Sequence, residues 1–190
     1  MSTVTIFGTG NMGTAIASVV AAGGASVQHV GSADDASIRG DVVVLAVPYP
    51  ALAPIAAKYA GQLEGKIVVD ITNPLNFETF DSLVVPAGTS AAAELAKALP
   101  ASKVLKAFNT NFAATLAAKK LGPVNTTVLI AGDDADAKAT LAGLVTAGGV
   151  NAIDAGSLKR ANELEAMGFL QLTLAAGEKI SWTGGFGIIN

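Results

Sequence analysis

The sequence of 190 residues contains no cysteine and a single histidine, His29. Without thiols there are no disulfides, thiolate metal ligands or cysteine nucleophiles, and one imidazole excludes a histidine-rich metal centre. Charged residues make up only 14% of the chain, with 12 Lys and Arg against 15 Asp and Glu. Because a nucleic-acid backbone must be neutralised by a basic surplus, we expect no polynucleotide partner.

The chain also lacks an obvious catalytic pair. Neither Tyr49 nor Tyr59 is followed by a lysine four residues later, so the Tyr-Lys pair of short-chain dehydrogenases is absent. A serine nucleophile would need a histidine base, and His29 lies within a predicted strand. Chemistry that needs side-chain proton transfer is therefore disfavoured, whereas chemistry carried by bound cofactors needs little such help.

Targeting and membrane signals are absent as well. The first six residues lack the basic region and long apolar run of a signal peptide. The longest uncharged apolar stretch, residues 42–57, is interrupted by three prolines and is short for a membrane span. We therefore expect a cytoplasmic protein that does not contact a membrane.

What the sequence has is a high apolar content, 51%, arranged as short apolar runs that alternate with alanine-rich segments of helical length. Strands are predicted at residues 4–7, 27–30, 41–47, 66–71, 103–108, 126–131 and 150–153, and helices at 11–22, 50–60, 90–99, 134–147 and 157–176. This alternation predicts an α/β protein of the Rossmann type. We expect one domain over residues 1–190, with a doubly wound, mainly parallel sheet, helices on both faces and a C-terminal amphipathic helix.

Two segments depart from the alternation. Residues 30–41 are too few for the helix that normally crosses between parallel strands. Residues 73–88 form a long segment with two prolines and two phenylalanines. We predict a loop there, near the ligand edge of the sheet, that is either a lid or a packed surface excursion.

The strongest chemical signal is a glycine-rich turn between the first strand and the first helix, Gly8-Thr9-Gly10-Asn11-Met12-Gly13. In this pattern Gly8 permits the tight turn, Gly10 lets a pyrophosphate approach the backbone, and Gly13 lets the helix pack closely on the strand. Free backbone amides and the helix dipole then bind the phosphates. Its position directly after a strand predicts a dinucleotide site.

The end of the second predicted strand bears on which dinucleotide binds. NAD sites usually place an Asp or Glu there, to accept hydrogen bonds from the ribose hydroxyls. Here Gly31-Ser32 follow the strand, so NADP is favoured over NAD, with Ser32 contacting the 2′-phosphate. Its basic partner is not obvious, because Ala33 and two acidic residues come next, although Arg39 could reach back. Alternatively, Ser32 only caps a turn, which leaves the preference open.

Further motifs follow in order along the chain: Ala46-Val47-Pro48, Asp70-Ile71-Thr72-Asn73-Pro74, Lys106-Ala107-Phe108-Asn109-Thr110 and Glu163-Leu164-Glu165-Ala166-Met167. Together with the glycine turn and Gly31-Ser32, they resemble the small dinucleotide-binding oxidoreductases related to NADPH:deazaflavin-coenzyme reductases. The cytoplasmic domains of transmembrane ferric reductases belong to the same broad group. The resemblance extends over essentially the whole chain.

The resemblance implies a cofactor site. Thr9, Gly10, Asn11 and Met12 would hold the pyrophosphate, Ser32 would lie at the adenosine ribose, Ala46, Val47 and Pro48 would line the nicotinamide half, and Asn73 with Pro74 and Asn109 with Thr110 would surround the ring. One departure is Ala33, because family members commonly carry an arginine after the serine. A second departure is the missing crossover helix, which could leave the adenine more exposed.

Several other residues allow two interpretations. Tyr49, after Pro48, either stacks near the nicotinamide or packs beneath the loop. Asn109 and Thr110 either hydrogen-bond a carboxamide or a second ring, or form a turn. Asp70 is predicted to be a buried turn-former whose carboxylate accepts from backbone amides. Trp182 either covers a pocket or anchors the C-terminal segment.

The last predicted helix carries apolar residues at helical spacing, at Leu164, Met167, Leu170 and Leu174, in line with Gln171. This face is predicted to be core or a homodimer contact, and secondarily the wall of a pocket.

The leading hypothesis is an NADPH-dependent oxidoreductase that passes a hydride to a flavin, a deazaflavin or a small quinone-like acceptor. No catalytic side chain is assigned. The alternative is a non-catalytic dinucleotide sensor whose association with a partner depends on the bound nucleotide. An imine or hydroxy-acid reductase is disfavoured, because residues after Val150 are too few for the helical dimer domain of such enzymes.

Overall fold

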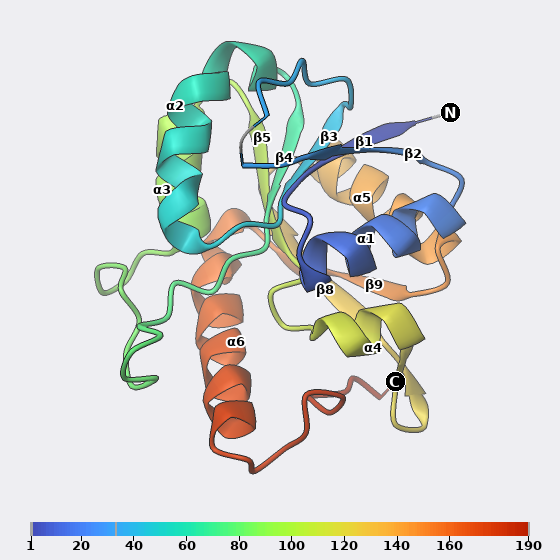
Figure 1. Cartoon of the computed structure of the whole chain (residues 1–190), viewed down its shortest axis with the longest axis vertical. Coiled ribbons are helices and arrows are strands. Elements are labelled where there is room, and N and C mark those ends of the chain that lie inside the picture. Colours follow the sequence, from blue (N-terminus) through green and yellow to red (C-terminus); the bar gives the residue numbers. More distant parts are fainter. Residues whose placement is uncertain (1, 33, 190) are drawn as a thin grey trace.

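Seven strands form one sheet in a computed structural model that describes residues 2–32 and 34–189 (Figure 1). Ala33, where family members commonly carry an arginine, lies outside the described residues. The strands, in spatial order, are β2 (Ser26–Val30), β1 (Thr3–Phe7), β3 (Val42–Leu45), β4 (Ile67–Asp70), β5 (Lys103–Ala107), β8 (Thr127–Gly132) and β9 (Asn151–Gly156). The strands from β2 to β5 are parallel to one another, which confirms the predicted mainly parallel sheet.

Helices cover both faces of the sheet, as predicted. They are α1 (Asn11–Ala22), α2 (Leu52–Leu63), α3 (Ala91–Ala98), α4 (Ala113–Ala118), α5 (Ala135–Ala147) and α6 (Ala161–Ala176). Helices α1 and α5 lie on one face, and α2 and α3 lie side by side on the other (Figure 1). A short 3₁₀ turn, Tyr49–Ala51, leads into α2, and another, Leu158–Arg160, leads into α6.

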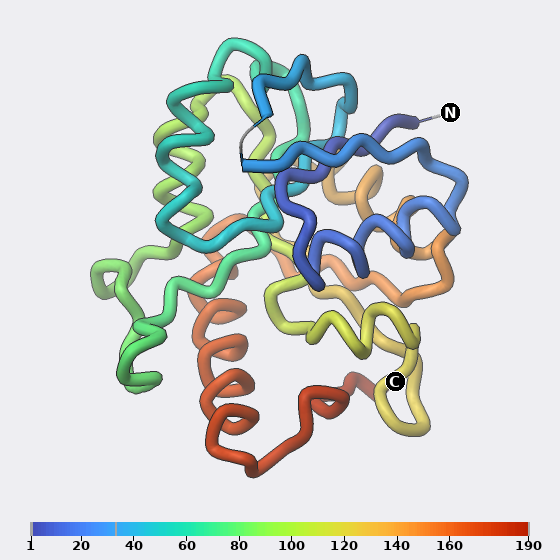
Figure 2. The backbone as a smooth tube through the Cα atoms, in the orientation of Figure 1, coloured from blue at the N-terminus to red at the C-terminus, as the bar shows by residue number. Residues whose placement is uncertain are grey.

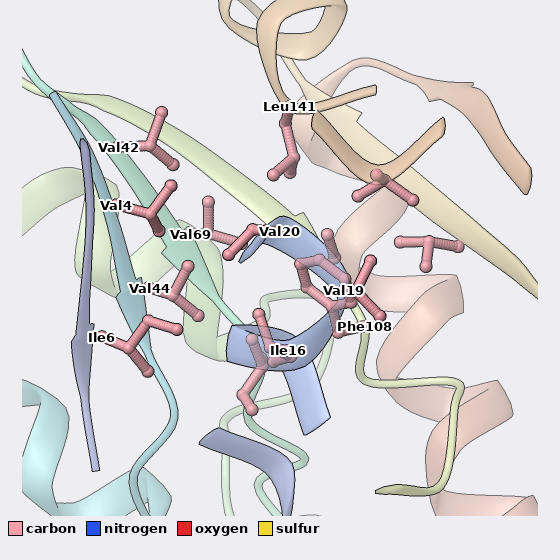
Figure 3. Close-up of a cluster of buried hydrophobic side chains, with 14 of the residues drawn as sticks. Val4, Ile6, Ile16, Val19, Val20, Val42, Val44, Val69, Phe108 and Leu141 are labelled. Atoms are coloured by element: carbon pink, nitrogen blue, oxygen red, sulfur yellow. The ribbon is translucent and has the colours of Figure 1, made fainter. Parts of the chain in front are cut away.

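The apolar strands fill two cores. On the α1 face, Ile16 and Val20 of α1 pack against Val4 and Val44, as Figure 3 shows. On the α2 face, strand and helix side chains form a second cluster around Tyr59. Because β1, β3 and β4 bury both faces, their near-continuous Val and Ile runs are what the sequence predicts for central strands.

The last two strands run opposite to the other five, so the sheet is mainly but not wholly parallel. Strand β8 is antiparallel to β5, and β9 is parallel to β8. The connection from β5 to β8 contains α4 and a hairpin, β6 (Lys120–Leu121) with β7 (Val124–Asn125), which the sequence did not predict. Six helical residues rise about 9 Å, whereas a five-residue strand spans about 16 Å. The helix is therefore too short to carry the chain back across the sheet, and β8 starts at the end where β5 finishes.

The connection between β2 and β3 contains no helix in its described residues, as predicted. The Gln28 side chain organises it: its Oε1 accepts from the Arg39 backbone amide at 3.0 Å, and its Nε2 donates to the Ser37 carbonyl at 2.9 Å. These bonds satisfy backbone groups that would be hydrogen-bonded within the helix if the connection were helical.

Residues 73–88 form the predicted loop, held by an isolated bridge between Leu75 and Leu83. In Figure 2 the segment projects from the body of the molecule beside α3 and α6. The rings of Phe77 and Phe80 pack edge to face, with centroids 5.7 Å apart. Whether this loop closes over a ligand stays a prediction.

Helix α6 buries a face that differs from the predicted apolar stripe. Its buried residues are Ala161, Leu164, Glu165, Gly168, Gln171 and Ala175. Leu164 and Gln171 are buried as predicted, but Leu170 is 52% exposed, so the core interpretation is wrong for that residue. Small and polar residues face inward because α6 packs on polar side chains of the site described below. In the described part of the chain, no helix is long and apolar enough to cross a membrane.

Candidate dinucleotide site

The glycine turn between β1 and α1 has the geometry that its residues predict. Gly8 has φ of +103°, and a Cβ there would overlap the Ala46 carbonyl oxygen. A Cβ on Gly13 would overlap the Gly8 carbonyl oxygen. Both positions therefore need glycine for close packing. A Cβ on Gly10 would meet no atom within 4 Å, so the space before Gly10 is open.

The N-terminus of α1 faces that open space without a capping group. Gly10 is the N-cap residue and has no side chain to accept from the first amides, and the first turn carries no acidic residue. The first amides of a helix lack partners within the helix, and the helix dipole favours negative charge there. The turn is thus a cradle that fits a diphosphate group.

A hollow of about 530 Å³ lies on one side of the turn, and we call it the Ser32 hollow. It is lined by Phe7, Gly8, Thr9, Gly10, Val30, Gly31, Ser32, Asp34, Ala46, Val47, Pro48, Ala51, Pro54, Ile55, Lys58 and Tyr59. Eight of the predicted site residues line this hollow. Gly13 does not line it and contributes through the packing of the turn. Ala46, Val47 and Pro48 share the hollow with Ser32 because β3 lies next to β1 in the sheet.

A second hollow of about 380 Å³, the Asn109 hollow, lies at the other side of the turn. It is lined by Asn11, Met12, Ile71, Asn73, Phe108, Asn109, Asn111, Phe112, Ala113, Ala114, Leu172 and Trp182. Asn73 follows β4 and Asn109 follows β5, and the carboxyl ends of these adjacent parallel strands meet at one sheet edge. This is where open α/β sheets bind their ligands.

Asn73 and Asn109 form a reciprocal pair at this edge. The Asn109 Nδ2 donates to Asn73 Oδ1 at 2.9 Å and to the Leu164 carbonyl at 2.8 Å, while Asn73 Nδ2 donates to the Asn109 carbonyl at 2.8 Å. The Oδ1 atoms of Asn109 and Asn111 are buried and accept no hydrogen bond from the described residues. Buried acceptors without partners are uncommon, and both asparagines line the Asn109 hollow.

The backbone around Asn109 is shaped for this pairing. Phe108 directly follows β5 and has φ of +64°, a left-handed conformation that non-glycine residues rarely adopt, and its ring is fully buried. On the facing helix α6, a Cβ on Gly168 would overlap Asn73 Oδ1. The close approach of α6 to the Asn73–Asn109 pair therefore requires glycine at position 168.

A buried ion network lies directly behind the pair. The Nζ of Lys106 is 2.9 Å from Asp70 Oδ2 and 2.8 Å from Glu165 Oε1, and it also donates to the Thr72 carbonyl. All three charged side chains are at most 1% exposed. Asp70 also accepts from the Thr72 amide at 2.7 Å, so its prediction as a buried turn-former is confirmed.

Glu165 joins this network to α3. Its Oε2 accepts from the Ala91 amide at 3.0 Å at the start of that helix. Burial raises the pKa of Glu165, and Lys106 opposes the shift. The network thereby fixes α6, α3 and the ends of β4 and β5 relative to one another.

Comparisons with known proteins agree with this geometry. A family model described as "NADP oxidoreductase coenzyme F420-dependent" matches residues 25–74. The F420-dependent NADP reductase of Methanocaldococcus jannaschii is 34% identical over 154 residues, which cover 79% of this chain and 69% of that protein. The chain belongs to this family. The resemblance inferred from the ordered motifs is therefore confirmed.

Other similar proteins extend the comparison. A putative F420-dependent NADP reductase of Arthrobacter sp. FB24 superposes with a TM-score of 0.86, covers 100% of both chains and is 24% identical, so it shows the fold. The Sinorhizobium meliloti protein SMa0349 has a TM-score of 0.70 at 30% identity, covering 83% of this chain and 86% of that one. The metalloreductase STEAP3 of Rattus norvegicus is 42% identical over 110 residues, 57% of this chain but only 21% of that protein.

Besides Gly13 of the turn, three predicted site residues line neither hollow. The Tyr49 hydroxyl donates to Glu94 Oε2 at 2.6 Å, in a separate groove between α2 and α3, and this bond raises the pKa of Tyr49 to about 12. Pro74 accepts from the Val84 amide at 2.7 Å and so holds the loop. Thr110 is buried, and its carbonyl accepts from Gln171 Nε2 at 3.2 Å.

Sequence reasoning missed the buried ion pair between Lys106 and Asp70 and the place of Lys58 in the site region. Lys106 and Asp70 are register partners on adjacent strands, and a charged residue in each of two apolar strands was the available signal. Trp182 was not missed: it packs on Phe112, with ring centroids 5.0 Å apart, and lines the Asn109 hollow, in line with the first of its two predicted roles. Lys58 lines the Ser32 hollow, whereas Arg39, the expected cation, does not.

Proposed function

We propose that this protein is an NADP-dependent oxidoreductase that transfers a hydride between the nicotinamide and a deazaflavin. The observation that carries the proposal is the position of two hollows on either side of one diphosphate cradle. Thr9 and Gly10 line the Ser32 hollow, and the next two residues, Asn11 and Met12, line the Asn109 hollow. A dinucleotide whose diphosphate lay on the turn would reach into both. The names of the family and of the similar Methanocaldococcus jannaschii reductase support NADP and F420 as the two reactants.

The residues divide the cofactor between the hollows. We assign the adenosine to the Ser32 hollow, with Ser32 at its ribose and Gly31 beside it. Ala46, Val47 and Pro48, which the resemblance assigned to the nicotinamide half, share that hollow and are proposed to contact the adenosine side. The nicotinamide and the acceptor ring are assigned to the Asn109 hollow.

The chemistry asks little of the side chains. NADPH supplies a hydride when bound, and the deazaflavin ring accepts it, so alignment is the main task of the protein. The free Oδ1 atoms of Asn109 and Asn111 can accept from a carboxamide or from a ring N–H. Apolar neighbours such as Ile71 and Phe112 exclude water from the same space. Because the cofactors carry the chemistry and the protein aligns them, no acid–base pair of side chains is needed.

The experiment mixes the protein with NADPH and separately with a deazaflavin, a flavin and a quinone. Loss of the reduced-nicotinamide absorbance is expected to be fastest with the deazaflavin. Tight binding of NADPH without turnover with any acceptor would refute the proposal and favour the sensor alternative. Turnover with the quinone alone would refute the choice of a deazaflavin.

We also propose that the protein acts in the cytoplasm as a homodimer, formed through the outer face of α6. Leu170 is half exposed there, and Met167 and Leu174 are only partly covered. Sedimentation velocity is expected to give a dimer for the intact protein and a monomer for Leu170→Glu. A monomeric intact protein would contradict the assignment.

A further inference from the structure

Among the described residues that line the Ser32 hollow, one is cationic, Lys58. We propose that Lys58 selects NADP over NAD by pairing with the 2′-phosphate of the bound dinucleotide. The assignment rests on the proposed function, because it takes the adenosine of NADP to occupy this hollow. It supplies the basic partner that the sequence around Ser32 lacks.

The fold brings Lys58 to this position from a distant part of the chain. Its neighbour on α2, Tyr59, is buried, packs its ring on Phe7 with centroids 5.1 Å apart, and donates its hydroxyl to the Asp34 carbonyl at 3.2 Å. The Nζ of Lys58 lies 3.3 Å from the same carbonyl oxygen. Two side chains of α2 thus bond to the backbone of Asp34, two residues beyond Ser32, and Asp34 and Lys58 both line the hollow.

The ammonium is available to a phosphate. Its charged contact in the structure is Asp35 Oδ1 at 3.1 Å, and that side chain is 93% exposed. Such an exposed ion pair is weak and screened by salt, so it is readily exchanged. An ammonium has three N–H donors, and a phosphate monoester carries more negative charge and more acceptor oxygens than a carboxylate. A 2′-phosphate in the hollow therefore competes well for Lys58.

One carboxylate in the hollow works in the opposite direction. The Asp34 Oδ2 accepts from the Gly31 amide at 2.6 Å, which places a negative charge next to Ser32. That charge repels a 2′-phosphate, and a carboxylate is the group that accepts from the ribose hydroxyls in NAD sites. Lys58 and Asp34 are therefore expected to set the NADP preference as opposing terms, with the cation dominant.

The test uses fragments that reach only the adenosine side. Isothermal titration calorimetry with the intact protein compares adenosine 2′,5′-bisphosphate with 5′-AMP, and NADPH with NADH. For Lys58→Met we expect the affinities for the bisphosphate and NADPH to fall about tenfold, because a charge-assisted contact is lost, while AMP and NADH affinities change less than about twofold. Lys58→Arg should retain the preference for the 2′-phosphate.

Asp34→Asn provides a second, independent variant. It keeps an oxygen that can accept from Gly31 but removes the charge, so the preference for the bisphosphate over AMP should increase several-fold. The matched control is Lys66→Met, since Lys66 lies just beyond α2, pairs with exposed Asp41 at 3.4 Å and does not line the hollow. It should leave all four affinities unchanged.

The outcomes are distinct. An unchanged bisphosphate affinity in Lys58→Met, or an equal loss for NADPH and NADH, would overturn the role of Lys58. If the 2′-phosphate preference depends on Lys58 but the intact protein does not reduce a deazaflavin, the assignment stands and the proposed function fails. If the intact protein binds neither the fragments nor the dinucleotides, both fail.

Discussion

The buried Lys106 is predicted to be the most sensitive charged residue of the protein. Lys106→Met would remove the only cation that contacts Asp70 and Glu165 within the described residues, while keeping most of the side-chain volume. Removing one partner of a buried ion pair leaves an uncompensated charge and costs about 3–5 kcal/mol. A typical domain has only about 5–15 kcal/mol of unfolding free energy, so the variant is expected to be marginally folded near neutral pH.

The cost should depend on pH in a definite direction. Burial raises the pKa of Glu165 from 4.5, so the folded protein holds this proton to a higher pH than the unfolded chain. The stability that protonation of Glu165 contributes is complete below the pKa of this group in the unfolded chain, and it is lost as the pH rises through its pKa in the folded protein. In the folded protein Lys106 lowers the pKa of Glu165, so the loss of Lys106 raises the pKa of Glu165 further. The deficit of Lys106→Met should therefore be larger at about pH 8 than at about pH 5.

Urea unfolding followed by the fluorescence of the single tryptophan measures both quantities. Lys103→Met is the matched control, because Lys103 lies on the same strand and pairs with Asp134 at 3.1 Å near the surface. An exposed pair of this kind contributes less than about 1 kcal/mol. Equal losses in the two variants, or a Lys106→Met deficit that does not change with pH, would refute the reasoning.

Three other predictions concern the site and its surroundings. Gly10→Leu should keep its melting temperature, since a Cβ there meets no atom within 4 Å, but weaken NADPH binding more than about tenfold in calorimetry; unchanged binding would contradict the diphosphate cradle. Gly168→Ala should lose about 1–3 kcal/mol in urea unfolding, because its Cβ would overlap the asparagine pair, whereas Gly143→Ala, with open space, should not lose stability. Glu94→Gln should lower the pKa of Tyr49 from about 12 toward 10.0 in an ultraviolet titration without changing NADPH affinity; a pKa that stays near 12 would contradict the hydrogen-bond assignment.

Local sequence signals predicted most of the fold. Helix α1 begins at Asn11 and ends at Ala22 as expected, because Gly10 and Gly23 flank an unbroken run of helix-compatible residues. The apolar run of β3 predicted a central strand, since only a strand covered on both faces is so uniformly apolar. Short elements were missed: α4 has six residues, too few to show a helical period.

Some features of the candidate site were likewise predictable from the sequence and others were not. The glycine turn and the paired strand ends were predictable, because a tight turn leaves its requirement for glycine in adjacent positions and parallel strands end at one edge. Tyr49 was not, because its hydroxyl bonds to Glu94, a residue 45 positions away on another helix. The direction of β8 also depended on the length of the connection rather than on the strand's own residues.

By itself, the sequence determined the alternating α/β architecture and the glycine turn before α1, since both depend on residues close together in the chain. Only the tertiary structure decided which charges meet. Glu165 reaches Lys106 because α6 packs over the ends of β4 and β5, and Lys58 reaches the Ser32 hollow because Tyr59 anchors α2 there. Such pairings depend on strand order and helix packing, and these are set by the burial of the whole core rather than by any local pattern.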